Sequence, residues 1–458
     1  MQKIAFRHRN NKILSLAPTK IIVLSFAAII LIGAILLTLP EASRDGKSIG
    51  FLNALFTATS ATCVTGLVVV DTYRHWTIFG QLVIISLIQA GGLGIVTLAT
   101  FFSVLLGRKM SLRSMVLAQE SISHFSFEGV VRLVSRVVMV TFGIELLGAL
   151  LLSSRFVPQY GPKGFYLGLF HSVSAFCNAG FDLMGIAGKG DFISLTQYNN
   201  DPIVLYTIAG LIVLGGLGFV VWKDLYDYRK KRYLLLHTKI VLVITLLLII
   251  LGTILFFTFE SNNPATMGKL DFVGKVNSAV FQSITPRTAG FNSIDEGGMK
   301  EISKFLTVIL MFIGAAPGST AGGIKVTTFG VLIFAILSQI RGSDETILFH
   351  KRVPFSIVNK ALAIAGFGAV LVLTVTSIVL AIEDKPFLNV LFEVTSAFGT
   401  VGLTTGLTPT LHSASKLLLI LTMFLGRVGP VTFAIALTLR SHKTDTDIIH
   451  PEGKVIVG

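Results

Sequence analysis

Residues 60–67 read Ser60-Ala61-Thr62-Cys63-Val64-Thr65-Gly66-Leu67, a short run of polar and apolar residues between two hydrophobic segments. Three later runs have a similar form and also close on a glycine followed by an apolar residue. They read Ser174-Ala175-Phe176-Cys177-Asn178-Ala179-Gly180-Phe181, Ile284-Thr285-Pro286-Arg287-Thr288-Ala289-Gly290-Phe291 and Ser396-Ala397-Phe398-Gly399-Thr400-Val401-Gly402-Leu403. The four glycines stand 114, 110 and 112 residues apart. This near-constant period predicts one structural unit repeated four times, because chance spacing would not also reproduce the flanking residues.

The composition indicates a membrane protein with little room for a soluble domain. The chain is 52% hydrophobic and 14% charged, whereas about a quarter of the residues in a soluble domain are charged. Several segments exceed the roughly 18 apolar residues that mark a membrane-spanning helix. The clearest are residues 21–40, 133–153, 202–222, 239–258, 361–382 and 414–439. The first of these is too long for the core of a secretory signal, so we interpret it as a retained transmembrane helix.

The uneven distribution of basic residues predicts how the chain lies in the membrane. The N-terminus, the tail from residue 440 and the loops 107–136, 222–239 and 341–360 together hold 23 Lys and Arg against 9 Asp and Glu. The opposite loops hold 12 Lys and Arg against 14 Asp and Glu. Since excess positive charge marks the cytoplasmic side, we expect a multi-pass plasma-membrane protein with both termini in the cytoplasm. The net charge of +14 is then a property of one membrane face and does not indicate nucleic acid binding.

Each repeated unit reads as a spanning helix, a half-helix, a loop and a second spanning helix. The half-helices are residues 51–62, 166–176, 272–284 and 387–398. At about 1.5 Å per residue they are too short to cross ~30 Å of hydrocarbon, so they must enter and leave on the same side. The sequence therefore predicts an all-α polytopic membrane protein with eight transmembrane helices and four re-entrant half-helices. The four M1–P-loop–M2 repeats are residues 1–106, 107–222, 223–340 and 341–440, followed by a cytoplasmic tail, residues 441–458.

The number of crossings per unit predicts how the units are related. Each unit crosses the membrane twice, so successive units share one orientation. They are then parallel repeats around one pseudo-four-fold axis, with a single pore along it. Inverted-repeat transporters need units with the opposite orientation, so this parity disfavours them.

The four loops after the half-helices are the predicted ion-binding site. Irregular backbone at membrane depth is tolerated where it lines a water-filled path, and rings of carbonyl oxygens can replace the hydration shell of a cation. The loops contain no Asp or Glu, which favours a monovalent cation over a divalent one. The partly negative C-terminal ends of the half-helices favour a cation as well. The candidate ligands are Cys63, Val64, Thr65, Gly66, Cys177, Asn178, Ala179, Gly180, Arg287, Thr288, Ala289, Gly290, Gly399, Thr400, Val401 and Gly402.

Enzymatic classes find no support in the sequence. The two cysteines, Cys63 and Cys177, each stand three residues before a repeat glycine, with no metal-ligand spacing and no disulfide pattern. No Ser/His/Asp or paired-carboxylate pattern is present, and Gly318 to Lys325 lacks the Gly-Lys-Ser/Thr run of a phosphate-binding loop. We therefore expect neither an enzyme nor an organic cofactor.

The loop sequences resemble the filter segments of the Trk/Ktr/HKT superfamily of potassium transporters, and the chain is similar to their KtrB-type membrane subunits over essentially its whole length. The most specific stretches are Thr62-Cys63-Val64-Thr65-Gly66-Leu67, residues 282–291, residues 396–403 and Gly426-Arg427-Val428-Gly429-Pro430. The resemblance implies K⁺ as the ion and one filter glycine per repeat. Cys63 departs from the family pattern, where we expect Thr.

A glycine-rich segment interrupts the second helix of the third repeat. It consists of Gly314, Ala315, Ala316, Pro317, Gly318, Ser319, Thr320, Ala321, Gly322 and Gly323. Four glycines and a proline in ten residues cannot sustain a helix. The resemblance implies an intramembrane gating loop across the conduction path, and a kink packed with small residues is the alternative.

Three charged residues within the predicted membrane region need a role. The resemblance places Arg427 at the cavity below the filter, where it would act as an electrostatic barrier or hold the gating loop through carbonyl bonds. The alternative is a buried arginine paired with Glu145. Arg287 would repel cations if it pointed into the pore, so we expect it to point away as part of the scaffold.

The sequence thus predicts a K⁺ uptake protein that forms a channel-like pore, with Na⁺ dependence as an open question. No nucleotide-binding fold fits inside this chain, so the resemblance implies gating by a separate cytoplasmic ring of KtrA- or KtrC-type subunits on a homodimer of this chain. The alternative function is a symporter that couples K⁺ to Na⁺ or H⁺. Glu145 is the clear intramembrane carboxylate for such coupling.

Overall fold

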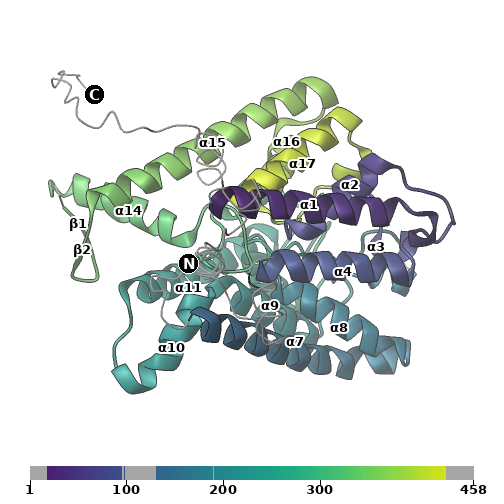
Figure 1. Cartoon of the computed structure of the whole chain (residues 1–458), viewed down its shortest axis with the longest axis horizontal. Helices are drawn as coiled ribbons and strands as arrows, with labels where there is room; N and C mark the ends of the chain where they lie inside the picture. Colours follow the sequence, from purple (N-terminus) through teal and green to yellow (C-terminus); the bar gives the residue numbers. More distant parts are fainter. Residues whose placement is uncertain (1–17, 95–96, 98–129, 189, 344, 430–458) are drawn as a thin grey trace, which may run out of the picture.

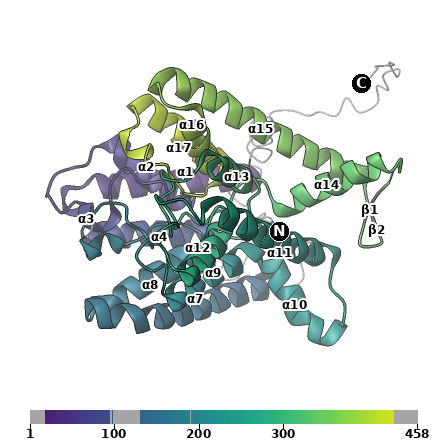
Figure 2. The same cartoon turned by 180° about the vertical axis from the view of Figure 1, so that it is seen from behind.

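The computed structural model describes residues 18–94, 97, 130–188, 190–343 and 345–429. The predicted cytoplasmic tail, residues 441–458, and most of the loop 107–136 lie outside the described residues. The chain is mostly helical (Figures 1 and 2). The short helix α3 (Thr72–His75) lies at one end of the molecule, and α10 (Phe219–Lys231) lies towards the other end.

Four helices of the described part are long and apolar enough to cross a membrane. They are α1 (Pro18–Thr38), α7 (Val130–Tyr160), α11 (Leu236–Glu260) and α15 (Phe355–Glu383). Their outer faces carry exposed leucine, isoleucine and valine side chains, such as Leu147 and Val370, as lipid contact requires. The sequence predicted eight spanning helices, more than the four in the described part of the chain that meet this criterion.

Each of these long helices packs against a half-helix that follows it in the chain. The half-helices are α2 (Phe51–Thr62), α8 (Lys163–Phe176), α12 (Phe272–Ile284) and α16 (Phe387–Gly399). Two of the four have the bounds that the sequence predicts, and the other two differ by three residues or fewer. Their fully buried aromatic residues, including Phe56, Phe281 and Phe392, fix them in the interior of the molecule by close packing.

A second set of shorter helices completes the bundle. The set consists of α4 (Ile78–Leu93), α9 (Pro202–Leu217), α13 (Glu301–Phe312) and α17 (Ser413–Val428). Three of them end at a glycine with positive φ: Gly94 at 82°, Gly218 at 87° and Gly429 at 90°. The predicted continuous helix 202–222 is therefore wrong, because the chain bends by 90° between α9 and α10.

The predicted interruption of a helix at residues 314–323 is present in the structure. Residues between α13 and α14 (Val326–Ile340) form an irregular segment at 314–323. A small antiparallel hairpin of β1 (Thr346–Leu348) and β2 (Lys351–Val353) then connects α14 to α15. The prediction of an all-α chain did not include this hairpin, since three-residue strands give no detectable period in a sequence.

Short turns complete the connections at the end of the molecule that carries α3. They are η2 (Pro40–Ala42), η3 (Met184–Ala187) and η4 (Thr408–Thr410). Asp71 accepts hydrogen bonds from the backbone N–H groups of Tyr73 and Arg74 and so caps α3.

Candidate functional site

The four predicted filter loops, residues 63–66, 177–180, 287–290 and 399–402, share one backbone shape. The second residue of each loop has positive φ: 59° at Val64, 60° at Asn178, 73° at Thr288 and 51° at Thr400. The glycine two positions later is also left-handed, with φ between 71° and 95°. Positive φ at a β-branched residue costs on the order of 1–3 kcal/mol and concentrates at functional sites.

The loops meet in a closed ring in chain order. A Cβ placed on Gly66 would lie 2.4 Å from the Ala179 carbonyl oxygen, and one on Gly180 would lie 2.8 Å from that of Ala289. The contacts continue from Gly290 to the Val401 oxygen at 2.5 Å, and from Gly402 back to the Thr65 oxygen at 2.2 Å. Each glycine is thus required because a neighbouring carbonyl occupies the space of a side chain. The four carbonyl oxygens that precede the glycines all belong to this ring.

Serine side chains anchor two of the loops. The Gly66 N–H donates to Ser60 Oγ at 3.0 Å, and the Gly402 N–H donates to Ser396 Oγ, also at 3.0 Å. Ser174 occupies the same place in the second loop, but its Oγ has no hydrogen-bond partner among the described residues. These serines were not among the predicted site residues, although a serine six residues before the glycine recurs in three of the four loops.

The first residues of the first three loops have buried side chains, and the fourth loop begins with Gly399, which has none. Arg287 donates to the carbonyl and hydroxyl oxygens of Thr245 on α11, at 3.4 and 3.2 Å, in agreement with its predicted scaffold role. Cys63 and Cys177 are buried free thiols. Cys177 Sγ lies 3.9 Å from Glu145 Oε1, which places that carboxyl behind the second loop.

The segment 314–323, the predicted gating loop, contacts residues of the predicted second and fourth repeats. Its Ala316 N–H donates to the Gly216 carbonyl at 3.0 Å, and Thr320 Oγ1 donates to the Phe176 carbonyl at 3.2 Å. A Cβ on Gly322 would lie 2.1 Å from Thr400 Oγ1 in the fourth filter loop. Lys325 Nζ donates to the Ala321 carbonyl at 2.7 Å. The segment therefore lies directly against the ring of filter loops.

Arg427 bridges this segment to the first repeat. Its guanidinium donates to the carbonyl oxygens of Thr320, Gly91 and Gly92. The alternative partner that the sequence suggested, Glu145, accepts instead from Gln89 at 3.1 Å. Arg427 thus has one bond to the segment 314–323, at Thr320, and its other carbonyl partners, Gly91 and Gly92, belong to α4.

Glycines of the second helices lie against the ends of the half-helices. A Cβ on Gly91, Gly215 or Gly426 would lie 1.9, 1.9 or 2.0 Å from the last helical or adjoining carbonyl of the preceding half-helix. These carbonyl oxygens belong to Thr62, Phe176 and Phe398. The Gly-Gly-Leu-Gly runs in α4 and α9 thus serve close helix packing.

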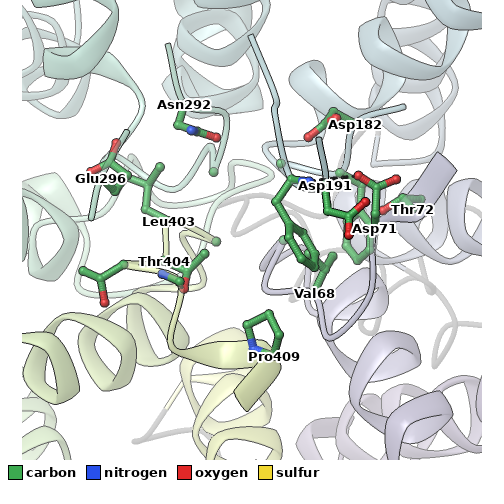
Figure 3. Close-up of a pocket in the computed structure, with 18 of the residues that line it drawn as sticks. Val68, Asp71, Thr72, Asp182, Asp191, Asn292, Glu296, Leu403, Thr404 and Pro409 are labelled. Carbon is green, nitrogen blue, oxygen red and sulfur yellow. Dashed lines mark hydrogen bonds between the residues drawn. The ribbon is translucent and has the colours of Figure 1, made fainter. Parts of the chain in front are cut away.

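A cavity of about 450 Å³ opens on one side of the ring. We call it the vestibule, and its floor consists of the four filter glycines, Gly66, Gly180, Gly290 and Gly402. Five carboxylates line its walls: Asp71, Asp182, Asp191, Asp295 and Glu296. Figure 3 shows Glu296, Asn292 and Thr404 on one wall, with the labelled aspartates across from them. The described residues that line the vestibule include neither Lys nor Arg.

The donor set fits a monovalent cation better than a bound divalent metal. The described residues contain no group of three or more His, Cys, Asp or Glu side chains placed to hold a metal ion. The ring instead offers backbone carbonyl oxygens, which suit a K⁺ ion that has shed its water.

The sequence matches the family described as TrkH, cation transport protein, over residues 1–445. It is 43% identical to Ktr system potassium uptake protein B of Bacillus subtilis, over 96% of this chain and 97% of that protein. It is 41% identical to the Ktr system potassium uptake protein B of Vibrio alginolyticus, over 96% and 94%. It is 38% identical to the potassium/sodium uptake protein NtpJ of Enterococcus hirae, over 97% and 98%.

The fold is also found in a solved structure. The potassium transporter TrkH from Vibrio parahaemolyticus superposes with a TM-score of 0.72 at 18% sequence identity, covering 95% of this chain and 87% of that one. The family resemblance that the loop sequences predicted is therefore confirmed. The chain belongs to the TrkH family of cation transport proteins.

Proposed function

We propose that this chain takes up potassium ions across the plasma membrane as the pore-forming subunit of a Ktr-type system. The observation that carries the proposal is the closed ring of four loops, in which a carbonyl oxygen precedes each left-handed glycine. The ring contains no carboxylate, so it suits a monovalent cation. The names of the two Ktr system proteins and of NtpJ support K⁺ as the ion.

The proposed architecture is four parallel M1–P-loop–M2 repeats around a pseudo-four-fold axis. The cyclic order of glycine contacts, from the first loop to the fourth and back to the first, supports it. The half-helices then enter from the outside, and the vestibule faces the external medium. Both termini lie in the cytoplasm, on the side of α10 and of the hairpin β1–β2.

The segment 314–323 is the proposed gate, and Arg427 holds it closed. We propose that a cytoplasmic nucleotide-binding ring of the KtrA or KtrC type acts on a homodimer of this chain to release the gate. The word "system" in the names of the relatives supports a second subunit. Na⁺ dependence finds support in the printed name of NtpJ.

Coupled symport is the second candidate function, and one observation favours it. Glu145 is only 2% exposed and lies behind the second filter loop, beside Cys177 and Gln89. A carboxyl in that position could exchange a proton as ions pass. The open-pore reading is preferred because the ring itself offers a continuous set of carbonyl ligands.

Reversal potentials in proteoliposomes test the proposal. The chain is purified with its co-encoded regulatory subunit, and K⁺ current is measured with and without nucleotide at varied Na⁺ and pH. A potential that follows the K⁺ gradient alone indicates a channel-like pore. A potential that shifts with a fixed stoichiometry of Na⁺ or H⁺ indicates the symporter, and the absence of any K⁺ current contradicts both.

A further inference from the structure

The wall of the vestibule contains a buried carboxylate that the filter does not use. Glu296 lies in the loop between α12 and α13, lines the cavity and is only 2% exposed. Its Oε1 accepts a hydrogen bond of 2.8 Å from Gln282 Nε2. Its Oε2 has no hydrogen-bond partner among the described residues. An unpaired carboxylate oxygen in a buried place is costly unless a positive group compensates it.

A second unpaired acceptor belongs to the same pair of side chains. Gln282 is fully buried on α12, and its Oε1 is also without a partner in the part of the chain that the structure describes. The bond between Gln282 Nε2 and Glu296 Oε1 holds the two side chains together, so two free oxygen acceptors belong to one fixed unit. Both acceptors require a donor or a cation.

The two charged groups that act electrostatically on Glu296 are both carboxylates. Asp295 precedes Glu296 and also lines the vestibule. Glu260 on α11 interacts electrostatically with Glu296 as well. Glu260 is already saturated by Ser303, Thr266, Asn263 and the Lys300 N–H. Across the cavity, Asp191 is paired with Arg74 at 2.8 Å. Glu296 therefore differs from these other acids because it combines burial with an oxygen that nothing compensates.

We propose that Glu296 and Gln282 form a binding site for one alkali cation in the vestibule wall, separate from the ring of filter loops. The site rests on the proposed function, in which ions enter through the vestibule. An entering ion then reaches this site before it reaches the glycine ring. Carboxylate and amide oxygens are the ligands that alkali and other hard cations prefer. The carboxylates do not converge to chelate a divalent ion, so a monovalent cation is the ligand.

Two sources share this chemistry, the transported K⁺ and a separate regulatory Na⁺. Equilibrium binding of ⁸⁶Rb⁺ and of ²²Na⁺ to the purified full chain, each displaced by unlabelled K⁺ or Na⁺, distinguishes them. The variant Glu296→Gln keeps the size of the side chain and removes its charge. Glu301→Gln is the matched control, because Glu301 is exposed on α13 and pairs with Lys304 outside the vestibule.

Glu296→Gln should weaken one high-affinity component by on the order of ten-fold, and Glu301→Gln should leave both isotopes unchanged. A loss in the component displaced by K⁺ identifies an outer site of the transport path, and a loss in the component displaced by Na⁺ identifies a Na⁺ site. If Glu296→Gln binds both isotopes as the wild type does, a shared proton satisfies the two oxygens and the proposal is wrong.

A second variant covers a failure of Glu296→Gln to fold. Glu296→Asp keeps the charge but withdraws the carboxylate from Gln282 by one methylene, so binding should weaken by about three-fold; unchanged binding would overturn the site. Because binding is measured without transport, the two proposals fail separately. If Glu296→Gln loses cation binding but the wild type shows no K⁺ uptake, the proposed function is wrong and the site stands. If Glu296→Gln keeps full binding and the wild type takes up K⁺, the site is wrong and the proposed function stands.

Discussion

At the scale of single residues, a serine stands six residues before the filter glycine in three of the four loops, and the third loop has Ile284 at that position. Ser60 and Ser396 each accept a glycine N–H, whereas Ser174 has no such bond among the described residues. A hydrogen bond of this kind contributes about 1 kcal/mol, which corresponds to a factor of about five in an equilibrium. We expect Ser60→Ala combined with Ser396→Ala to lower the K⁺ over Na⁺ permeability ratio about five-fold, measured from bi-ionic reversal potentials.

Ser174→Ala is the matched control for that experiment. It removes the same hydroxyl at the same place in the repeat, where the hydroxyl bonds to no described group. Its permeability ratio should equal that of the wild type. A similar drop in both proteins would show that the hydroxyls act on packing alone.

Glycine at the ring is a stricter requirement than glycine on the outer part of α15. Gly402 has a φ of 94°, and a Cβ there would lie 2.2 Å from the Thr65 carbonyl oxygen. Gly402→Ala should reduce K⁺ uptake by ten-fold or more, since either the ring or the backbone must shift. Gly366 on α15 has nothing within 4 Å of such a Cβ. Gly366→Ala should therefore keep full uptake at equal membrane expression.

At the scale of elements, Arg427 on α17 connects the segment 314–323 to α4. Removing its bonds to Thr320, Gly91 and Gly92 should free the segment, so we expect Arg427→Ala to raise K⁺ flux several-fold without the regulatory subunit. The measurement is ⁸⁶Rb⁺ efflux from proteoliposomes that contain this chain alone.

Arg427→Lys separates the two roles that the sequence left open. Lysine keeps the positive charge but lacks the planar fork that reaches carbonyls on two elements. A raised flux in both variants identifies the bonds as the cause. A raised flux in Arg427→Ala with normal flux in Arg427→Lys would identify an electrostatic barrier instead.

The elements that the sequence predicted well were those with a strong local signal. The half-helices at 51–62 and 272–284 follow from short apolar runs that close on a repeated glycine. The bend at Gly218 was not predicted, because glycines are frequent within transmembrane helices and the run Gly215-Gly216-Leu217-Gly218 was compatible with close helix packing. The Phe219 N–H at the bend bonds to the distant Gly318 carbonyl. The partners of Arg427 are backbone carbonyls, which every residue has, so they leave no mark in the sequence.

At the scale of the whole molecule, the closed ring needs four similar loops. It therefore explains both the internal period of the sequence and the match of the whole chain to one family. Each loop contacts the next one through a glycine and a carbonyl, so no loop can be formed correctly without its two neighbours. The vestibule depends on all four loops for the same reason. Its carboxylates come from segments that follow the half-helices α2, α8 and α12, and therefore its charge could not be predicted from any one motif.

The vestibule also predicts a dependence of cation binding on pH, which reports the orientation of the molecule. Burial raises the pKa of Glu296 to about 8; the Gln282 hydrogen bond opposes this shift, and the Asp295 and Glu260 carboxylates add to it. Glu296 is charged above that pH and neutral below it, so protons compete with the cation on the acid side. Asp182 lines the same cavity, and burial raises the pKa of its carboxyl to about 7. Between pH 9 and pH 6 the KM for external K⁺ should therefore rise several-fold in wild type and rise less in Glu296→Gln, where Asp182 still titrates. The effect should follow external pH at constant internal pH, and a response to internal pH would place the vestibule on the cytoplasmic side.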